Sequence, residues 1–106
     1  MNNKKIWIVD DDKSIRWVLE KALQSNDIDI QTFSQPDAVL KRINDEEPDV
    51  VITDIRMPGM DGISLLDRIK KQSPNTPVII MTAYSDLDRT VSAFQSGAFE
   101  YLSKPF

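Results

Sequence analysis

The chain has 106 residues, and its 41% hydrophobic and 28% charged content is typical of one soluble globular domain. Seventeen acidic against thirteen basic residues give a formal net charge of −4, which argues against the basic surface that a DNA-binding domain needs. The sequence has neither cysteine nor histidine, which excludes disulfides, thiolate or imidazole metal sites and phosphohistidine chemistry on this chain.

The first apolar segment is short. Only four apolar residues, Ile6 to Val9, precede three aspartates, which is too few for a signal peptide core or a membrane span. We therefore expect a cytoplasmic protein that makes no contact with a membrane.

Five short runs rich in branched apolar residues follow one another along the chain and predict strands. The third and fourth runs are apolar without alternation, which indicates parallel strands covered on both faces. The predicted strands are Lys5–Val9, Ile28–Phe33, Asp49–Thr53, Pro77–Thr82 and Phe99–Leu102.

Four segments with helical spacing separate these runs. In the first, the apolar residues between Ile15 and Leu23 fall on one face. The second begins at Pro36, a residue suited to a first helical turn, and the third ends at Lys70-Lys71, where basic side chains favour a helix C-terminus. The fourth spans about 86–96, and Gly97 is predicted to terminate it.

The order of these elements predicts the fold class. Four βα units and a final strand, joined by right-handed crossovers, give an α/β doubly wound five-stranded parallel sheet with the flavodoxin-like order 2-1-3-4-5. A fifth helix would normally cover the last strand, yet the sequence stops at Phe106. We expect residues 1–106 to form a single domain that is truncated before its last helix.

Polar residues stand at four of the predicted strand ends. In an open parallel sheet, ligands bind beyond the carboxyl ends of the strands, where the strand order reverses. Clustered carboxylates repel one another unless a cation intervenes, and oxygen ligands without histidine or cysteine favour Mg²⁺. Acids, a metal, a lysine and a hydroxyl together indicate phosphoryl chemistry. The residues concerned are Asp10, Asp11, Asp12, Asp54, Thr82 and Lys104.

Each of these residues alone has an ordinary structural explanation. Asp12 could serve only to cap the first helix, Lys104 could be a solvated surface lysine, and Thr82 could bond to backbone. Their joint placement at separate strand ends is what favours a functional site.

The motifs at these positions resemble those of receiver domains of bacterial two-component response regulators. The likeness rests on the stretches 9–12, 54–62, 81–83 and 104–106, and it covers essentially the whole chain. Within that family the sequence is most similar to nitrogen-regulation receivers, which belong to activators of transcription by RNA polymerase with an alternative sigma factor.

The resemblance implies that Asp54 accepts a phosphoryl group from a partner sensor histidine kinase in a Mg²⁺-dependent reaction. It assigns Asp10, Asp11, Asp54 and the backbone carbonyl of Arg56 as metal ligands. Since three aspartates are consecutive, Asp12 is an alternative ligand to Asp10.

The resemblance also implies how the signal is transmitted. Lys104 and Thr82 would contact the phosphoryl oxygens, and the peptide bond before Pro105 would be cis. Tyr101 would be the aromatic switch residue that moves inward with Thr82, and the segment 86–96 would shift.

The implied function is a signalling switch rather than a turnover enzyme, although the domain would assist its own phosphorylation and dephosphorylation. Its output would come from an ATPase module and a helix-turn-helix DNA-binding domain of the same polypeptide, with no direct nucleic acid contact by this chain. The sequence leaves open a phosphorylation-dependent homodimer.

A phosphatase and a silent interaction module are alternatives to the signalling switch. In a haloacid-dehalogenase-type phosphatase, Asp10 would be the nucleophile and Asp12 the acid/base, but the chain has no room for a cap insertion and no acidic pair after Lys104. A receiver-like interaction module that is never phosphorylated usually loses part of the acid–lysine set, and here that set is complete.

Four further residues carry structural predictions. Trp7 and Trp17 are expected to be packing residues rather than ligand platforms. Gly59 and Gly62 are expected to supply backbone freedom in the loop after Asp54.

Overall fold

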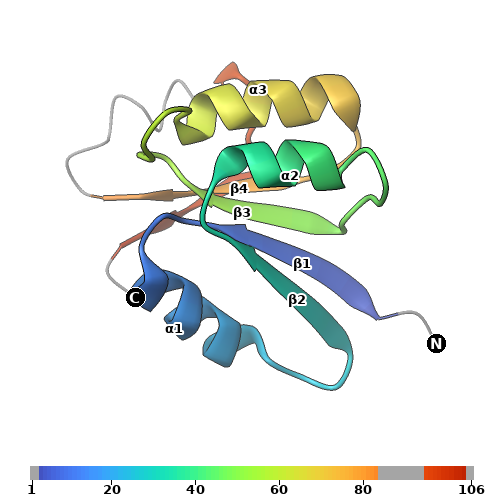
Figure 1. Ribbon diagram of the computed structural model, residues 1–106, viewed down its shortest axis with the longest axis vertical. Helices are drawn as coiled ribbons and strands as arrows, with labels where there is room; N and C mark the ends of the chain where they lie inside the picture. The colour runs from blue at the N-terminus through green and yellow to red at the C-terminus, as the bar shows by residue number, and fades with distance from the viewer. Residues whose placement is uncertain (1–2, 84–94, 105–106) are drawn as a thin grey trace.

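A computed structural model of the chain describes residues 3–83 and 95–104 (Figure 1). Five parallel strands form one sheet in the order β2-β1-β3-β4-β5, as the sequence predicted. The strands are β1 (Lys4–Val9), β2 (Ile28–Phe33), β3 (Val50–Asp54), β4 (Val78–Thr82) and β5 (Glu100–Ser103). The helices given by the described residues are α1 (Lys13–Leu23), α2 (Pro36–Arg42) and α3 (Gly62–Gln72).

The strand β1 lies between β2 and β3 in the sheet and pairs with both. Ile8 is in register with Thr32 on one side and with Ile52 on the other. After β1 the chain crosses to β2, and after β3 it crosses to β4, in the opposite direction along the sheet. The carboxyl ends of these two neighbours are the topological switch point, where ligands bind in such sheets.

The third strand begins and ends one residue later than predicted. Asp49 stands before the strand, where its carboxylate accepts a hydrogen bond of 2.7 Å from the backbone N–H of Lys5. Asp54 is consequently the last residue of β3 and is in register with Met81 of β4. The side chain of Asp54 is thus held by the edge of the sheet rather than by a loop.

Helices cover both faces of the sheet. Figure 1 shows α2 and α3 on one face and α1 on the other. Because side chains alternate along a strand, Trp7 and Val9 of β1 pack in the core under α2 and α3, whereas Ile8 packs with Leu19 of α1. The two cores share the sheet and fix its strands from both sides.

The two tryptophans differ. Trp7 is buried, and its ring centroid lies 5.3 Å from that of Phe33. Trp17 is 61% exposed, so the prediction that it is a packing residue is wrong. The buried face of α1 contains Ile15 and Leu19, and Trp17 lies about 200° around the helix from Ile15, which turns its ring to solvent.

Several predictions fall wholly or mostly outside the described residues. These are the fourth helix over 86–96 and the cis bond before Pro105. Gly97 is described, and its φ of +104° is the left-handed conformation expected of a glycine that terminates a helix. Over residues 3–83 and 95–104, no helix has the length and apolar content needed to cross a membrane.

Candidate functional site

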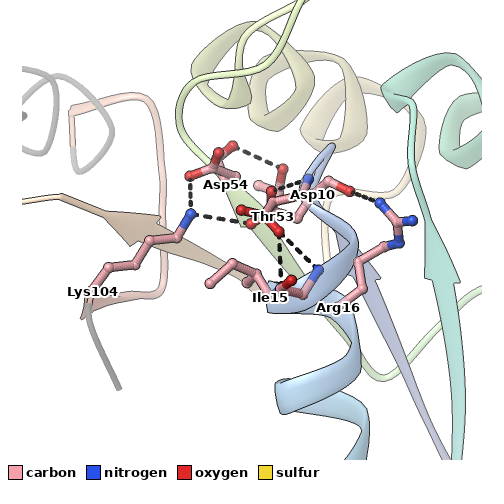
Figure 2. A network of polar contacts seen from close by, with 8 residues as sticks. Asp10, Ile15, Arg16, Thr53, Asp54 and Lys104 are labelled. Atoms are coloured by element: carbon pink, nitrogen blue, oxygen red, sulfur yellow. Dashed lines mark hydrogen bonds and ion pairs between the residues drawn. The ribbon is translucent and has the colours of Figure 1, made fainter.

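Polar side chains meet at the carboxyl edge of the sheet. Asp10 follows β1, Asp54 ends β3, Thr82 ends β4 and Lys104 follows β5. Asp10, Thr82 and Asp54 are all buried, although each is polar. Figure 2 shows the Lys104 side chain reaching across to Asp10 and Asp54. The parallel topology therefore brings together residues that are far apart in the sequence.

The three consecutive aspartates have three different environments. Asp10 is fully buried, with 0% of its surface exposed, whereas Asp11 and Asp12 are exposed. Asp12 is the N-cap of α1, and its Oδ1 accepts hydrogen bonds from the backbone N–H groups of Ser14 at 2.8 Å and Ile15 at 3.3 Å. The capping explanation for Asp12 is thus what the structure shows.

Asp10, Asp11 and Asp54 form an acidic cluster. One carboxylate oxygen from each lies within 4.8 Å of the others, and Asp12 does not belong to this group. Three carboxylates at this separation repel one another and attract a cation. Since every donor is oxygen, the cluster fits a hard divalent ion such as Mg²⁺.

Lys104 is an internal counter-charge for this cluster. Its ammonium Nζ lies 3.0 Å from Oδ1 of Asp54 and 3.1 Å from Oδ2 of Asp10. Burial by itself would lower the pKa of Lys104. The hydrogen bonds and negative charges of Asp54 and Asp10 outweigh that effect and hold the pKa above its usual range. Lys104 is therefore a permanent cation at neutral pH.

The pKa of Asp10 is also raised, but for a carboxyl group a raised pKa disfavours the charged form. Burial raises the pKa of its carboxyl group, and the negative charge of Asp54 adds to that rise. The hydrogen bond from the backbone N–H of Asp12 and the contact with Lys104 lower the pKa, but they do not cancel the rise. The contact with Lys104 thus does not outweigh the effect of burial on Asp10.

The backbone around Asp54 is fixed by the loop that follows it. The N–H of Gly62 donates a 2.9 Å hydrogen bond to the carbonyl of Ile55. A Cβ atom on Gly62 would overlap the Asp54 carbonyl oxygen and lie 2.9 Å from Cα of Ile55. Gly62 is needed for this close approach and not for a positive φ, so the prediction of backbone freedom is right for Gly59, with φ +84°, and wrong for Gly62.

The other predicted site residues lie on or near the same edge. Thr82 is buried at the end of β4, and its carbonyl accepts a 2.7 Å hydrogen bond from the backbone N–H of Lys104. Arg56 lies in the loop after β3 with an exposed side chain. Tyr101 is on β5, in register with Ile80, and is 43% exposed.

Arg16 is a site neighbour that sequence reasoning missed. Its Nη1 donates a 2.6 Å hydrogen bond to the backbone carbonyl of Asp10, on the side of Asp10 away from Lys104 (Figure 2). The sequence gives only a weak sign of it, a basic residue in the helix that follows an acidic strand end. No local motif specifies a bond between positions six residues apart.

Known proteins resemble this chain in sequence. The family described as "Response regulator receiver domain" matches residues 6–106. The chain is 57% identical over 106 residues to the "DNA-binding transcriptional regulator NtrC" of Proteus hauseri, covering 100% of this chain and 22% of that protein. The protein of the same name from Escherichia coli (strain K12) is 57% identical over 101 residues, with 95% and 22% covered. The chain thus spans about a fifth of the length of these relatives.

Solved structures are similar to this chain in fold as well as in sequence. The apo receiver domain of nitrogen regulatory protein C, determined in solution, superimposes with a TM-score of 0.88 and 56% identity, covering 100% of this chain and 86% of that chain. NtrX from Brucella abortus in complex with ADP has a TM-score of 0.91 and 36% identity, covering 98% of this chain and 24% of that one.

The haloacid-dehalogenase alternative is not favoured. The matching family covers residues 6–106, including the loop after Asp54 that a phosphatase would leave without a role. Asp10, the nucleophile of that alternative, is fully buried, and both of its carboxylate oxygens already accept hydrogen bonds from Asp12 and Lys104.

Proposed function

The chain belongs to the response regulator receiver domain family, and on that premise we propose that Asp54 is the residue that accepts the phosphoryl group. The observation that carries the proposal is the pair of contacts from Lys104, whose ammonium lies 3.0 Å from Asp54 and 3.1 Å from Asp10. Asp54 is 8% exposed, so a donor can reach it at the edge of the sheet, whereas Asp10 is sealed.

We propose Mg²⁺ as the cofactor, held by the carboxylates of Asp10, Asp11 and Asp54 and by the backbone carbonyl of Arg56. Support comes from the cluster of three carboxylate oxygens within 4.8 Å, all of them oxygen donors. The capping role of Asp12 speaks for Asp10 rather than Asp12 as the buried ligand. When bound, the ion neutralises carboxylate and phosphoryl charge and aligns the phosphoryl group.

The chemical step is a direct transfer. The phosphoryl donor is a phosphorylated histidine of the partner kinase. An oxygen of the Asp54 carboxylate attacks phosphorus, the bond from phosphorus to the histidine nitrogen breaks, and its electron pair stays on that nitrogen. Lys104 then exchanges its hydrogen bond to Asp54 for one to a phosphoryl oxygen, which stabilises the charge that the group carries. Water attack on the acyl phosphate in the same environment would return free Asp54, which is the self-dephosphorylation we propose.

The switch that follows involves Thr82 and Tyr101. Phosphorylation adds about −1.5 to −2 charge and three acceptor oxygens at Asp54. We propose that the Thr82 hydroxyl moves to these oxygens and that Tyr101, which is 43% exposed in this state, turns inward into the space that Thr82 vacates. A modification that is bonded better in one conformation than in another shifts the equilibrium between the two.

The wider role concerns a longer protein. Because the chain spans 22% of the length of the NtrC proteins it matches, we propose that residues 1–106 act as the receiver unit of a transcriptional activator. Its phosphodonor would be a histidine kinase, and its output an ATPase module and a helix-turn-helix domain. The net charge of −4 supports an output that does not run through DNA contact by this chain.

Intact mass after incubation with acetyl phosphate and Mg²⁺ tests the assignment. We expect one phosphoryl adduct, lost in Asp54→Asn and in the absence of Mg²⁺. Asp67→Asn, which removes an exposed carboxylate from α3, is the matched control and should retain the adduct. An adduct that survives Asp54→Asn would move the nucleophile to the aspartates after β1, and no adduct on a folded chain would refute the switch.

A further inference from the structure

Arg16 joins the first helix to the end of the first strand. It lies in α1, and its Nη1 donates a hydrogen bond of 2.6 Å to the backbone carbonyl of Asp10 (Figure 2). Asp10 joins the sheet through its N–H, which donates a 3.1 Å hydrogen bond to the carbonyl of Phe33, whereas Arg16 binds its carbonyl, beyond the end of β1. The bond therefore acts on the turn between β1 and α1, which carries two of the three clustered acids.

Every polar group of Asp10 is engaged. Its N–H pairs with Phe33, its Oδ1 accepts from the N–H of Asp12 at 2.9 Å, and its Oδ2 accepts from Lys104. The remaining group, the carbonyl, is held by Arg16 alone among the described side chains. Arginine suits this task because its charge is permanent and its planar guanidinium is less strongly hydrated than an ammonium.

The Asp10 carbonyl also determines where Asp11 lies. The peptide unit is planar, so the orientation of that carbonyl fixes the direction of the Asp11 N–H and the position of its Cα. Asp11 is exposed, and no hydrogen bond among the described residues reaches its carboxylate. Within residues 3–83 and 95–104, its direction is consequently set through its backbone, and Arg16 is the side chain that holds this backbone.

We propose that Arg16 is a positioning residue of the cation site, which orients the Asp10–Asp11 peptide and through it the Asp11 carboxylate. This inference rests on the proposed Mg²⁺ site at Asp10, Asp11 and Asp54. It differs from a general charge effect, because an additional positive charge beside the cluster would weaken cation binding rather than support it.

The test compares two cations by isothermal titration calorimetry. Mg²⁺ demands near-ideal octahedral geometry, whereas Ca²⁺ tolerates irregular sites. In Arg16→Met, which keeps most of the apolar stem and removes the donors, we expect the Kd for Mg²⁺ to rise about tenfold. The Kd for Ca²⁺ should rise by less than about threefold, since its coordination adapts to a displaced Asp11.

Two further variants separate position from charge. Arg16→Lys keeps the charge and loses the planar fork, so it should still weaken Mg²⁺ binding more than Ca²⁺ binding. Lys21→Met removes an exposed cation from the same helix and should leave both affinities unchanged within about twofold. Circular dichroism melting identifies variants that fail to fold. If Arg16→Met fails to fold, the comparison of the two cations is made with Arg16→Lys.

The outcomes are distinct. Unchanged Mg²⁺ affinity in a folded Arg16→Met, equal changes for the two cations, or full recovery in Arg16→Lys would overturn the positioning role while leaving the Mg²⁺ site in place. Failure of the unmodified chain to bind Mg²⁺ would overturn the cation site itself, and the role of Arg16 with it.

Discussion

Two groups of polar side chains lie at opposite ends of the same sheet. Near the amino ends of β3 and β4, the hydroxyls of Ser73 and Thr76 lie 2.6 Å apart, and both bond to Glu47, at 2.8 and 3.3 Å. At the carboxyl ends, three carboxylates form a cluster, and the ammonium of Lys104 contacts two of them, those of Asp10 and Asp54. The first group has one negative charge with two neutral donors, and the second has an excess of negative charge.

This difference separates structure from function. Within the described residues, every buried side-chain nitrogen or oxygen atom has a hydrogen-bond partner, so neither group is incomplete in hydrogen bonding. What distinguishes the carboxyl end is charge, because burial and the neighbouring Asp54 raise the pKa of Asp10 despite the contact with Lys104. The group at the amino ends is completed by hydrogen bonds within the protein, whereas the excess of negative charge at the carboxyl ends attracts a cation.

The largest expected effect is on the backbone at the carboxyl end. Gly62→Ala places a Cβ against the Asp54 carbonyl and should lower the free energy of unfolding by about 3 kcal/mol, since neither backbone segment can move cheaply. Gly59→Ala meets no atom within 4 Å and should lose only about 1 kcal/mol through its positive φ. Urea denaturation measures both. Equal losses would show that the loop adapts.

The next effect concerns the amino end. Thr76→Val removes the hydroxyl that bonds to Ser73 and Glu47 and should lower the free energy of unfolding by about 2 kcal/mol. Mg²⁺ affinity should not change, because the site lies at the other edge of the sheet. Thr32→Val, at an exposed position of β2, is the control and should change stability by less than about 0.5 kcal/mol. A change in Mg²⁺ affinity in Thr76→Val would show that the two ends of the sheet are energetically coupled.

A smaller effect, with the opposite sign, is expected for Asp10→Asn. The folded protein holds the Asp10 proton more tightly than the unfolded chain, whose pKa is near 3.8, so ionised Asp10 opposes folding at neutral pH and ceases to do so as the pH falls below 3.8. With EDTA present, Asp10→Asn should raise the free energy of unfolding at pH 7 by about 1 kcal/mol. The difference in the free energy of unfolding between Asp10→Asn and the unmodified chain should shrink toward pH 3. A destabilised variant would show that the contact with Lys104 outweighs burial.

The smallest expected effect is at alkaline pH. The pKa of Lys104 is raised above 10.5, so its contribution to stability is complete below pH 10.5 and is lost as the pH rises through the folded-state pKa. The difference in unfolding free energy between the unmodified chain and Lys104→Met should therefore narrow above pH 10.5, by about 1 kcal/mol or less. Stopped-flow urea unfolding across this range measures it. A constant difference would assign the effect of Lys104 to packing.

The residues at the ends of the predicted strands indicated much of the site. Asp54, Thr82 and Lys104 were predicted to meet because parallel strands end at one edge, and the structure places all three there. The environments of Asp10 and Asp12 were not predictable in the same way. Consecutive residues with the same side chain differ only in where the backbone directs them, and that depends on where β1 ends and α1 begins.

The sequence by itself determined the order of strands and helices, the sheet order and the set of residues at the strand ends. These depend on local periodicity and on the handedness of crossovers, which neighbouring residues encode. Only the tertiary structure decided that Lys104 contacts Asp10 across 94 positions, that Arg16 holds the Asp10 carbonyl, and that Gly62 lies against the Asp54 backbone. Such contacts arise when separate elements pack, and their distances depend on the whole sheet rather than on any segment of it.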